Sequence, residues 1–213
     1  MISRCGISVV EAPEDDAVSL DTLKAYLVID DDRDDASLTI TLNAAIGRYQ
    51  EICNVRLVTQ TLKATYDRFP STDAFRSRWG TFSLVDNTVQ PVQTGQIVLP
   101  TGPVQSVESI KYLDQNGTEQ TWDDAEYRVD VSGMPARIVP VSLSSWPAAL
   151  TTAGSVRVEF VAGFGDPADI PAQVVQSILQ AAAYAWQSRG AFDPNVYDAV
   201  LRMGDTGIGV WVP

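Results

Sequence analysis

Apolar residues near the start of the chain recur at the spacing of amphipathic helices. Ser19, a residue type that favours the N-cap, precedes a short predicted helix. Its apolar positions are Leu20, Leu23 and Leu27. After the polar run of residues 30–35, a longer helix is predicted over about residues 34–53. Its apolar stripe is Leu38, Leu42, Ala45, Ile46, Tyr49 and Cys53.

The pattern changes to strand-like alternation after residue 54. Residues 56–66 are rich in Val and Thr and predict a strand, whereas residues 70–94 are polar and predict a loop or a flexible hairpin. The turn at residues 114–117 contains Asn-Gly, which tolerates positive φ and therefore predicts a hairpin. The other short predicted strands cover residues 97–99, 104–113, 118–122, 127–131, 137–141 and 156–162.

Helical spacing returns after the GFGDPADIP segment. A helix is predicted to open at Asp169 or Pro171 and to end at Gly190. Its apolar band is Val174, Val175, Ile178, Leu179, Ala182, Tyr184 and Trp186. A last helix is predicted over residues 194–202, with a stop at Gly204, and an apolar tail without helical period follows it.

This order of helices, then strands, then helices predicts an α+β fold. We expect the terminal segments to share one helical core of about four helices, with a small antiparallel β region inserted between them. The predicted segments are an N-terminal helical segment (1–55), the inserted β region (56–165), a C-terminal helical segment (166–204) and an extended tail (205–213).

Charge and hydropathy narrow the classes of function. The 213 residues include 27 acidic and 15 basic ones, giving a net charge of −12. Nucleic-acid grooves need clustered Lys and Arg, so tight DNA binding is not expected. No apolar stretch approaches the ~20 residues that span a bilayer, and residues 1–16 lack the features of a signal peptide. We therefore expect no membrane partner and a cytosolic origin.

The sequence contains no histidine, which excludes nucleophiles activated by histidine, zinc sites with histidine ligands and histidine acid–base chemistry. An enzyme would depend on carboxylates, Lys, Tyr or a carboxylate-bound metal. Cys5 and Cys53 form no CxxC pair, and a disulfide between them is disfavoured in a reducing cytosol. Cys53 is expected to be a small core residue. We predict no catalytic, cofactor-binding or metal-binding residues.

Three segments resemble functional motifs but depart from them. Residues 30–35 alternate like calcium ligands, yet Asp35 and Thr41 stand where an EF-hand loop needs Gly and Glu. A solvated interhelical loop, whose last aspartates cap the next helix and favour its positive end, is the better interpretation. The carboxylates of residues 123–126 could support glycosidase chemistry but are more typical of surface charge. The GFGDP segment lacks the Lys and Ser/Thr of a phosphate-binding loop and is interpreted as a strand-to-helix connector.

The apolar tail has two interpretations, which the sequence leaves open. Its large apolar residues alternate with small ones, so the segment can lie extended along a groove or a sheet edge. Either it folds back on its own domain or it is a docking arm for another chain. The candidate docking residues are Ile208, Val210, Trp211, Val212 and Pro213.

Several stretches together resemble the head–tail connector (adaptor) family of long-tailed phages and gene transfer agents. Residues 11–70 are similar to the family's "eaP" lead-in, Leu-x-x-x-Lys helix, acidic loop and Gln-Thr strand ending near Phe-Pro. LPTGPVQSVESIKYLDQNG resembles its hairpin, and SWPAAL with VRVEFVAGFGDPADIP resembles its approach to the C-terminal helix. The likeness covers roughly residues 11–192. Tyr26-Leu27-Val28 departs from a His-Leu-Arg-like sequence in many relatives, and residues 71–96 form a longer excursion.

The resemblance implies a virion component at the head–tail interface of a phage or phage-like particle, made in the host cytoplasm. It implies a ring, usually of twelve subunits, that binds the portal protein and a stopper or tail-completion protein. Genome DNA would pass through the ring without specific binding, and the tail would grip the portal. No enzymatic activity is implied. The rival hypotheses are a carboxylate-dependent hydrolase or metal enzyme, and a tail-terminator or other completion protein.

Overall fold

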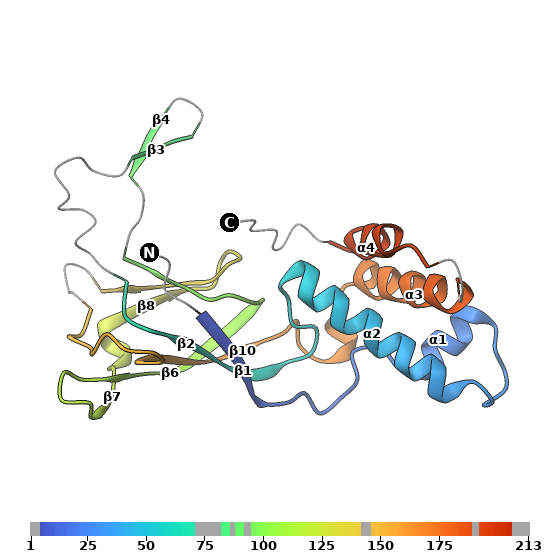
Figure 1. Ribbon diagram of the computed structural model, residues 1–213, viewed down its shortest axis with the longest axis horizontal. Helices are drawn as coiled ribbons and strands as arrows, with labels where there is room; N and C mark the ends of the chain where they lie inside the picture. The colour runs from blue at the N-terminus through green and yellow to red at the C-terminus, as the bar shows by residue number, and fades with distance from the viewer. Residues whose placement is uncertain are drawn as a thin grey trace. The chain divides into compact units, whose positions relative to one another are not determined.

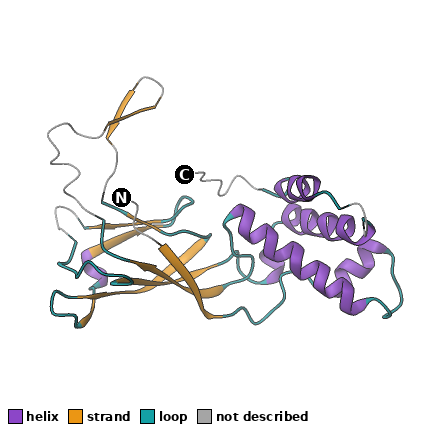
Figure 2. Ribbon diagram, in the orientation of Figure 1, coloured by secondary structure: helices purple, strands orange, loops and turns teal. Residues whose placement is uncertain are grey.

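The computed structural model describes residues 5–70, 82–85, 88–91, 95–141, 146–188 and 192–205. The chain divides into two compact units (Figures 1 and 2). We call the one that holds the sheets the β unit; it consists of Met1–Val10, Thr61–Pro100 and Val104–Val161. The other, the helical unit, consists of Glu11–Gln60, Thr101–Pro103 and Ala162–Pro213.

The described strands of the β unit form three sheets. The largest has five strands in the order β1-β2-β10-β6-β7, a second has the order β5-β9-β8, and β3 pairs with β4. The strands are β1 (Cys5–Glu11), β2 (Gln60–Tyr66), β3 (Phe82–Val85), β4 (Thr88–Pro91), β5 (Ile97–Val98), β6 (Val104–Leu113), β7 (Glu119–Thr121), β8 (Tyr127–Asp130), β9 (Arg137–Pro140) and β10 (Val156–Ala162). The pairs β3–β4, β5–β9, β6–β7 and β8–β9 are antiparallel.

Burial alternates along β2 and β10, two inner strands of the five-stranded sheet. Every second residue of each strand is buried, so one face of the strand supplies the core. In β10 the buried positions are Val156, Val158, Phe160 and Ala162. Next to them, β6 contributes the fully buried Ile110. The core therefore follows the period-2 pattern visible in the sequence.

The predicted hairpin at residues 114–117 is confirmed. β6 and β7 pair in the register Leu113↔Glu119, and Gly117 has φ +81 at the turn. The Asp114 side chain organises the turn by accepting hydrogen bonds from the backbone N–H groups of Asn116 (2.8 Å) and Thr118 (2.9 Å). These bonds stabilise the charged carboxylate and lower the pKa of Asp114.

Four helices are described in the helical unit: α1 (Leu20–Leu27), α2 (Asp35–Cys53), α3 (Ala172–Gln187) and α4 (Pro194–Arg202). Helix α3 packs against both α2 and α4. Ser19 caps α1 as predicted, because its side chain accepts a hydrogen bond from the Thr22 N–H (3.2 Å). The core of this unit comprises Leu23, Leu38, Leu42, Ala45, Tyr49, Cys53, Val174, Ile178, Ala182 and Leu201.

The α+β fold class is confirmed, with helices and antiparallel strand pairs in separate units. The helix predicted over residues 34–53 is α2, and the buried Cys53 is the core residue that its position indicated. Burial raises the pKa of the Cys53 thiol, which keeps it neutral. The predicted end at Gly190 lies outside the described residues, and α3 ends at Gln187.

One strand prediction was too long. Residues 56–59 do not belong to β2, which begins at Gln60. Instead, isolated bridges join Val55 to Gly102 and Val58 to Gly165. The partners are glycine-containing connections rather than strands, so a regular ladder cannot form there. The alternation of Val and Thr in this stretch thus marks an extended backbone without a sheet.

The GFGDP segment is a connector between β10 and α3, as interpreted from its sequence. Gly163 and Gly165 both have φ near +140, a region that disfavours residues with a Cβ. A Cβ at Gly163 would lie 2.5 Å from the Thr59 backbone nitrogen. The two glycines therefore let this connector pass close to the extended 55–59 backbone before α3 begins.

Candidate interaction surfaces

The predicted docking residues Ile208, Val210, Trp211, Val212 and Pro213 lie outside the described residues. The structure does describe the point from which the tail leaves, at Gly204 and Asp205 directly after α4. Their backbone N–H groups donate to the carbonyls of Leu201 (3.1 Å) and Arg202 (3.0 Å). This tight turn ends α4 where the sequence placed the stop.

Gly204 is a buried anchor for the tail. The Tyr49 hydroxyl of α2 donates a buried 2.9 Å hydrogen bond to the Gly204 carbonyl. Burial raises the pKa of Tyr49, so its hydroxyl stays protonated and remains a donor. A Cβ at residue 204 would meet the Ser177 side chain, with 2.8 Å to its Cβ, and would lie 3.1 Å from the Gln173 carbonyl oxygen. Only glycine fits this position between α2 and α3 without displacing a neighbour.

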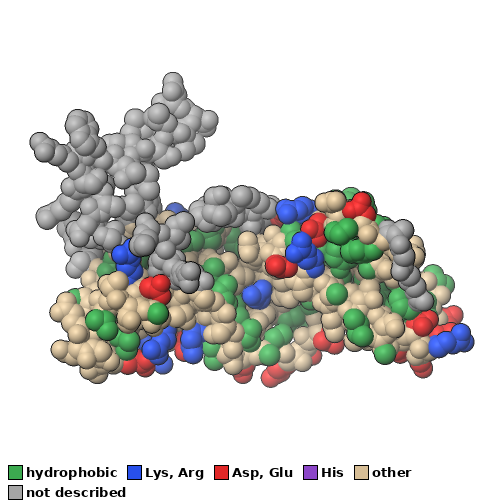
Figure 3. Space-filling model, viewed as in Figure 1, with side chains coloured by type: hydrophobic (Ala, Val, Ile, Leu, Met, Phe, Trp, Pro, Cys, Tyr) green, Lys and Arg blue, Asp and Glu red, His purple; other side chains and the backbone are tan. Residues whose placement is uncertain are grey.

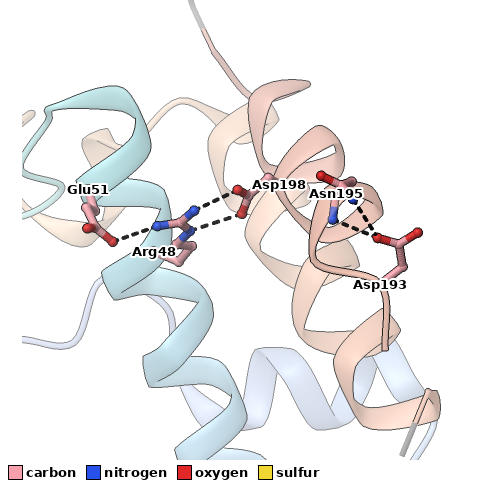
Figure 4. A network of polar contacts seen from close by, with 5 residues as sticks. All are labelled: Arg48, Glu51, Asp193, Asn195 and Asp198. Carbon is pink, nitrogen blue, oxygen red and sulfur yellow. Dashed lines mark hydrogen bonds and ion pairs between the residues drawn. The ribbon is translucent and has the colours of Figure 1, made fainter. Parts of the chain in front are cut away.

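An ion pair fixes α4 against α2 (Figure 4). The Arg48 guanidinium donates two hydrogen bonds to the Asp198 carboxylate, from Nε (3.0 Å) and Nη2 (2.7 Å). Its Nη1 donates to Glu51 (2.9 Å) one turn along α2. The two-pronged geometry orients α4, and the guanidinium lowers the pKa of Asp198. No local pattern in the sequence connects Arg48 to a partner 150 residues away.

The start of α4 is fixed by a cap and by aromatic contacts. The Asp193 side chain accepts a hydrogen bond from the Asn195 N–H (2.9 Å), and Pro194 occupies the first turn. Phe192 packs against Tyr197 and Tyr184, with ring centroids 5.2 and 6.0 Å apart. Both ends of α4 are therefore held, which defines the helix as a rigid element at the root of the tail.

The outer side of α4 is apolar. Phe192, Val196 and Met203 are large hydrophobic residues that expose 48%, 43% and 74% of their surface, and Val200 between them is partly exposed. Figure 3 shows hydrophobic side chains gathered over α4 on the face in view. Clusters of exposed apolar residues are common at interaction sites, so this surface is a candidate contact.

A second exposed apolar group lies at the connection between α1 and α2. Val28 is 84% exposed and adopts a left-handed conformation (φ 58) as the C-cap of α1, which is unfavourable for a β-branched residue. Tyr26 and Ile40 are also exposed. The following acidic loop is organised by Lys24, whose ammonium contacts Asp32 (2.6 Å) and Asp35 (2.9 Å).

This lysine contact was missed in the sequence, where residues 30–35 were interpreted only as a solvated loop. The hydrogen bond and charge of Asp32, followed by those of Asp35, raise the pKa of Lys24, and Lys24 in turn lowers the pKa of Asp32. In the sequence, Lys24 lies eight residues before Asp32. A lysine and an aspartate at this spacing have no regular geometry, so the contact could not be predicted. The predicted cap is only partly present, since Asp34 occupies the N-cap without a side-chain hydrogen bond.

In the β unit, the edge strand β1 exposes Ile7, Val9 and Val10. An edge strand with apolar side chains is a candidate for contact with another chain. An aromatic cluster elsewhere in this unit, of which Phe69, Trp122 and Trp146 are buried, was also missed. Its members, with ring centroids 5.0 to 5.8 Å apart, are Phe69, Tyr112, Trp122, Tyr127 and Trp146. They come from separate segments, so no local pattern reveals them.

The carboxylates of residues 123–126 have local structural partners. Asp123 accepts a hydrogen bond from the Ala125 N–H (3.0 Å) and caps the short 3₁₀ turn Asp124–Glu126. Glu126 accepts one from the Trp122 indole N–H (2.6 Å). Both side chains thus support the aromatic cluster and the start of β8. This engagement favours the surface-charge interpretation over paired catalytic carboxylates.

No group of three or more Cys, Asp or Glu residues in the described part of the chain is arranged to hold a metal ion. No helix among the described residues has the length and apolarity to cross a membrane.

Comparisons with known proteins identify the fold. Scans of the sequence against protein-family models and against curated proteins find no match. Seven solved chains match this protein, and the three described below do so over nearly their whole length. A chain of the virion of a native gene transfer agent particle has a TM-score of 0.67 and 20% identity, covering 97% of each chain.

The other two matching chains come from necks of gene transfer agent particles. The neck of an empty particle, computed with C6 symmetry, gives a TM-score of 0.62 and 21% identity. The neck of a native particle, computed with C12 symmetry, gives 0.64 and 20%. Each match covers 98% of this chain and 97% of the other. The protein therefore has the fold of a chain found in the neck and virion of gene transfer agent particles.

Proposed function

We propose that this protein is a structural head–tail connector (adaptor) subunit of a tailed phage or gene transfer agent. In this role it forms a ring under the portal, bridges the portal to stopper or tail proteins and surrounds the DNA channel. The observation that supports the proposal most strongly is a shared fold over 97–98% of this chain with neck and virion chains. A likeness of this extent includes both units, rather than one common module.

The exposed surfaces are compatible with a ring. A cyclic ring is built from head-to-tail contacts, which need two different surfaces on each subunit. The chain carries separate exposed apolar groups on α4, at the α1–α2 connection and on the edge strand β1. Two of them can serve contacts between copies while a third contacts a different protein. The C6 and C12 symmetries of the related neck structures support a ring as the form of assembly.

The distribution of charge is compatible with a DNA channel. The helical unit contains 16 acidic and 6 basic residues. A negative wall repels phosphates, so DNA can slide past it without the counterion release that makes basic grooves bind tightly. We propose that part of this unit faces the genome.

The tail is the proposed portal-docking arm, and the buried anchor at Gly204 determines how this can be tested. A deletion that removes Gly204 would also remove the carbonyl that Tyr49 binds. A deletion that begins at Thr206 leaves the anchor in place. We expect particles with the 206–213 deletion to lack joined tails, and purified portal to retain the full-length subunit but not the deletion variant. Normally joined tails would contradict the docking role of this segment.

The connector role itself is tested by locating the subunit in intact particles. Cryo-electron microscopy should place its density as a ring at the portal exit, and particles without the protein should have filled or empty heads lacking tails. Overlong tails would instead identify a tail terminator. For the enzymatic rival, calorimetry with Ca²⁺ and Mg²⁺ is decisive, because a carboxylate-dependent metal enzyme must bind one of them. We expect no binding heat.

A further inference from the structure

Helix α1 ends in a strained valine that faces the solvent. Val28 is the C-cap of α1, with φ 58 and ψ 47, and its N–H donates to the Ala25 carbonyl (3.3 Å). Glycine is the usual residue in this conformation, because a branched side chain is unfavourable in the left-handed region. The Val28 side chain is 84% exposed, so packing within the subunit does not offset the strain. A strained residue whose side chain the fold does not use points to a contact outside the subunit.

The residues around Val28 define the chemistry of that contact. Tyr26, in the last turn of α1, exposes 45% of its surface. Asp30, two residues after Val28, adds an exposed carboxylate. We call Tyr26, Val28 and Asp30 the α1 tip. An apolar group with a carboxylate beside it fits a surface that is apolar and carries a cationic side chain.

A surface of this kind lies in the β unit, on the outer side of the β8–β9 pair. In the antiparallel register Arg128 lies opposite Val139, so the two side chains share a face. The neighbouring residue Ile138 is fully buried, which identifies the face of Arg128 and Val139 as the outer one. Val141, two residues beyond Val139, is 39% exposed. We call Arg128, Val139 and Val141 the β8–β9 face.

Arg128 is the uncompensated charge of this face. Asp130 and Arg137 lie opposite each other two residues along the ladder and form their own ion pair of 2.6 Å. Within the described part of the chain, no carboxylate forms an ion pair with Arg128, whose side chain is exposed. An exposed guanidinium beside two valines therefore matches the carboxylate and the valine of the α1 tip.

The charges of the two units favour this pairing between copies. Two helical units repel each other, because each contains 16 acidic and 6 basic residues. The β unit, with 11 acidic and 9 basic residues, does not oppose an acidic partner in this way. A contact between the α1 tip of one copy and the β8–β9 face of another joins two different surfaces, so it leaves one of each free and can be repeated.

We propose that copies of this protein associate head to tail, with the α1 tip of one copy seated on the β8–β9 face of the next. In this contact Asp30 pairs with Arg128, and Val28 packs against Val139 and Val141. The inference deepens the proposed function and rests on it for the closure of repeated contacts into a ring. The contact itself is a property of the isolated protein.

The first test separates binding from folding at a single residue. Val28→Gly relieves the strain and removes the side chain, so it should raise the urea midpoint of unfolding while weakening association between copies by about tenfold or more. Sedimentation velocity of the full-length protein over a range of concentrations measures the association. Ile40→Ser is the matched control: Ile40 is 71% exposed on α2 and lies outside the α1 tip, so association should be unchanged. A side chain needed only by the fold would give a lower midpoint and unchanged association.

The second test asks whether the two surfaces bind each other. Arg128→Glu should also prevent association, whereas Lys111→Glu, the same change of charge on β6 of the five-stranded sheet, should not. In a mixture of Val28→Gly and Arg128→Glu subunits, the first variant supplies an intact β8–β9 face and the second an intact α1 tip. We expect this mixture to form dimers that do not grow further, although neither variant associates alone at the same concentration.

Three outcomes would overturn the inference. They are an unmodified subunit that stays monomeric up to its solubility limit, a Val28→Gly variant that associates as the unmodified subunit does, and a mixture of the two variants that stays monomeric. None of these measurements involves the portal. Copies that associate as inferred but are absent from the portal exit would refute the connector role and keep the inference. A ring at the portal exit whose subunits touch through other surfaces would do the opposite.

Discussion

The two units differ sharply in charge. The helical unit contains 16 acidic and 6 basic residues, whereas the β unit contains 11 acidic and 9 basic ones. Nearly all of the net charge of −12 thus belongs to one unit. The helical unit also carries Gly204, from which the tail leaves, and the exposed apolar residues of α4, while the β unit carries the aromatic cluster and the edge strand β1.

This difference shows that the acidity is not a general solubility property of the chain. A surface that only needs solubility can spread its charges over both units. Concentration in the unit of α1–α4 indicates a local purpose, and we assign to that unit the proposed contacts with DNA and portal. The β unit, close to neutral, is then suited to contacts between like subunits, where strong repulsion would be a cost.

The largest expected effects test whether the two units are separate folding units. Leu38 in α2 and Ile110 in β6 are both fully buried, so replacing either with alanine should lower the free energy of unfolding by about 2–5 kcal/mol. Hydrogen exchange followed by mass spectrometry should show faster exchange in α1–α4 for Leu38→Ala and in the sheets for Ile110→Ala. If either variant caused faster exchange throughout the chain, the two units would not be separate folding units.

The next effect concerns the anchor of the tail in the helical unit. Gly204→Ala should destabilise this unit by about 1–3 kcal/mol, because its Cβ would meet Ser177 and the Gln173 backbone. Gly47→Ala is the matched control: it lies within α2 with no atom near its Cβ, so it should stabilise the helix by about 0.5–1 kcal/mol. Urea unfolding measures both. Equal effects of the two variants would show that Gly204 is not a packed anchor.

A smaller effect is expected at Val28, where an exposed β-branched residue has a left-handed backbone. Val28→Gly should raise the free energy of unfolding by up to about 1 kcal/mol, since the relief of strain exceeds the added chain entropy. Asn54 has a similar φ of 52 at the end of α2. Asparagine tolerates this region, so Asn54→Gly should change stability little. A loss of stability in Val28→Gly would mean that its side chain makes a contact in the fold.

The smallest effect compares one ion pair from each unit. Arg48 lowers the pKa of Asp198 in the helical unit, while Ser132 and Arg137 lower the pKa of Asp130 in the β unit. A carboxyl whose folded-state pKa is depressed contributes stability above its ordinary pKa of about 3.9, and this is lost as pH falls through the folded-state pKa. Asp198→Asn and Asp130→Asn should therefore each destabilise at pH 7 and much less at pH 3. A loss independent of pH would point to packing instead.

Local signals explain which elements could be predicted from the sequence. Ser19 and the apolar spacing after it define α1, and the Asn-Gly turn defines the β6–β7 hairpin, because the residues that decide these structures lie within a few positions of one another. The end of α4 was predicted for the same reason. The prediction for residues 56–59 was wrong because its outcome depends on distant glycine connections.

The candidate interaction surfaces were harder to predict from the sequence, because they depend on contacts between distant residues. The tail was identified from its apolar alternation, but its anchor joins Tyr49 to Gly204 across 155 positions. Val196 and Val200 have the same spacing as a buried helix face, and only the structure shows that Tyr197 and Leu201 are buried while Val196 and Met203 are exposed. The spacing of apolar residues identifies an apolar helix face, whereas the packing of the helices determines which face is buried.

The buried bond between Tyr49 and Gly204 also has a mechanical consequence. A force that pulls on the chain beyond Asp205 acts first on Gly204, which is hydrogen-bonded to α2 and wedged beside Ser177 of α3. The load therefore passes into α2, the longest of the described helices with 19 residues, instead of unwinding α4 from its end. The Arg48–Asp198 pair adds a second tie between the same two helices. In a subunit under tension, the contacts of Gly204 with α2 and α3 would therefore bear the load before α4 unfolds.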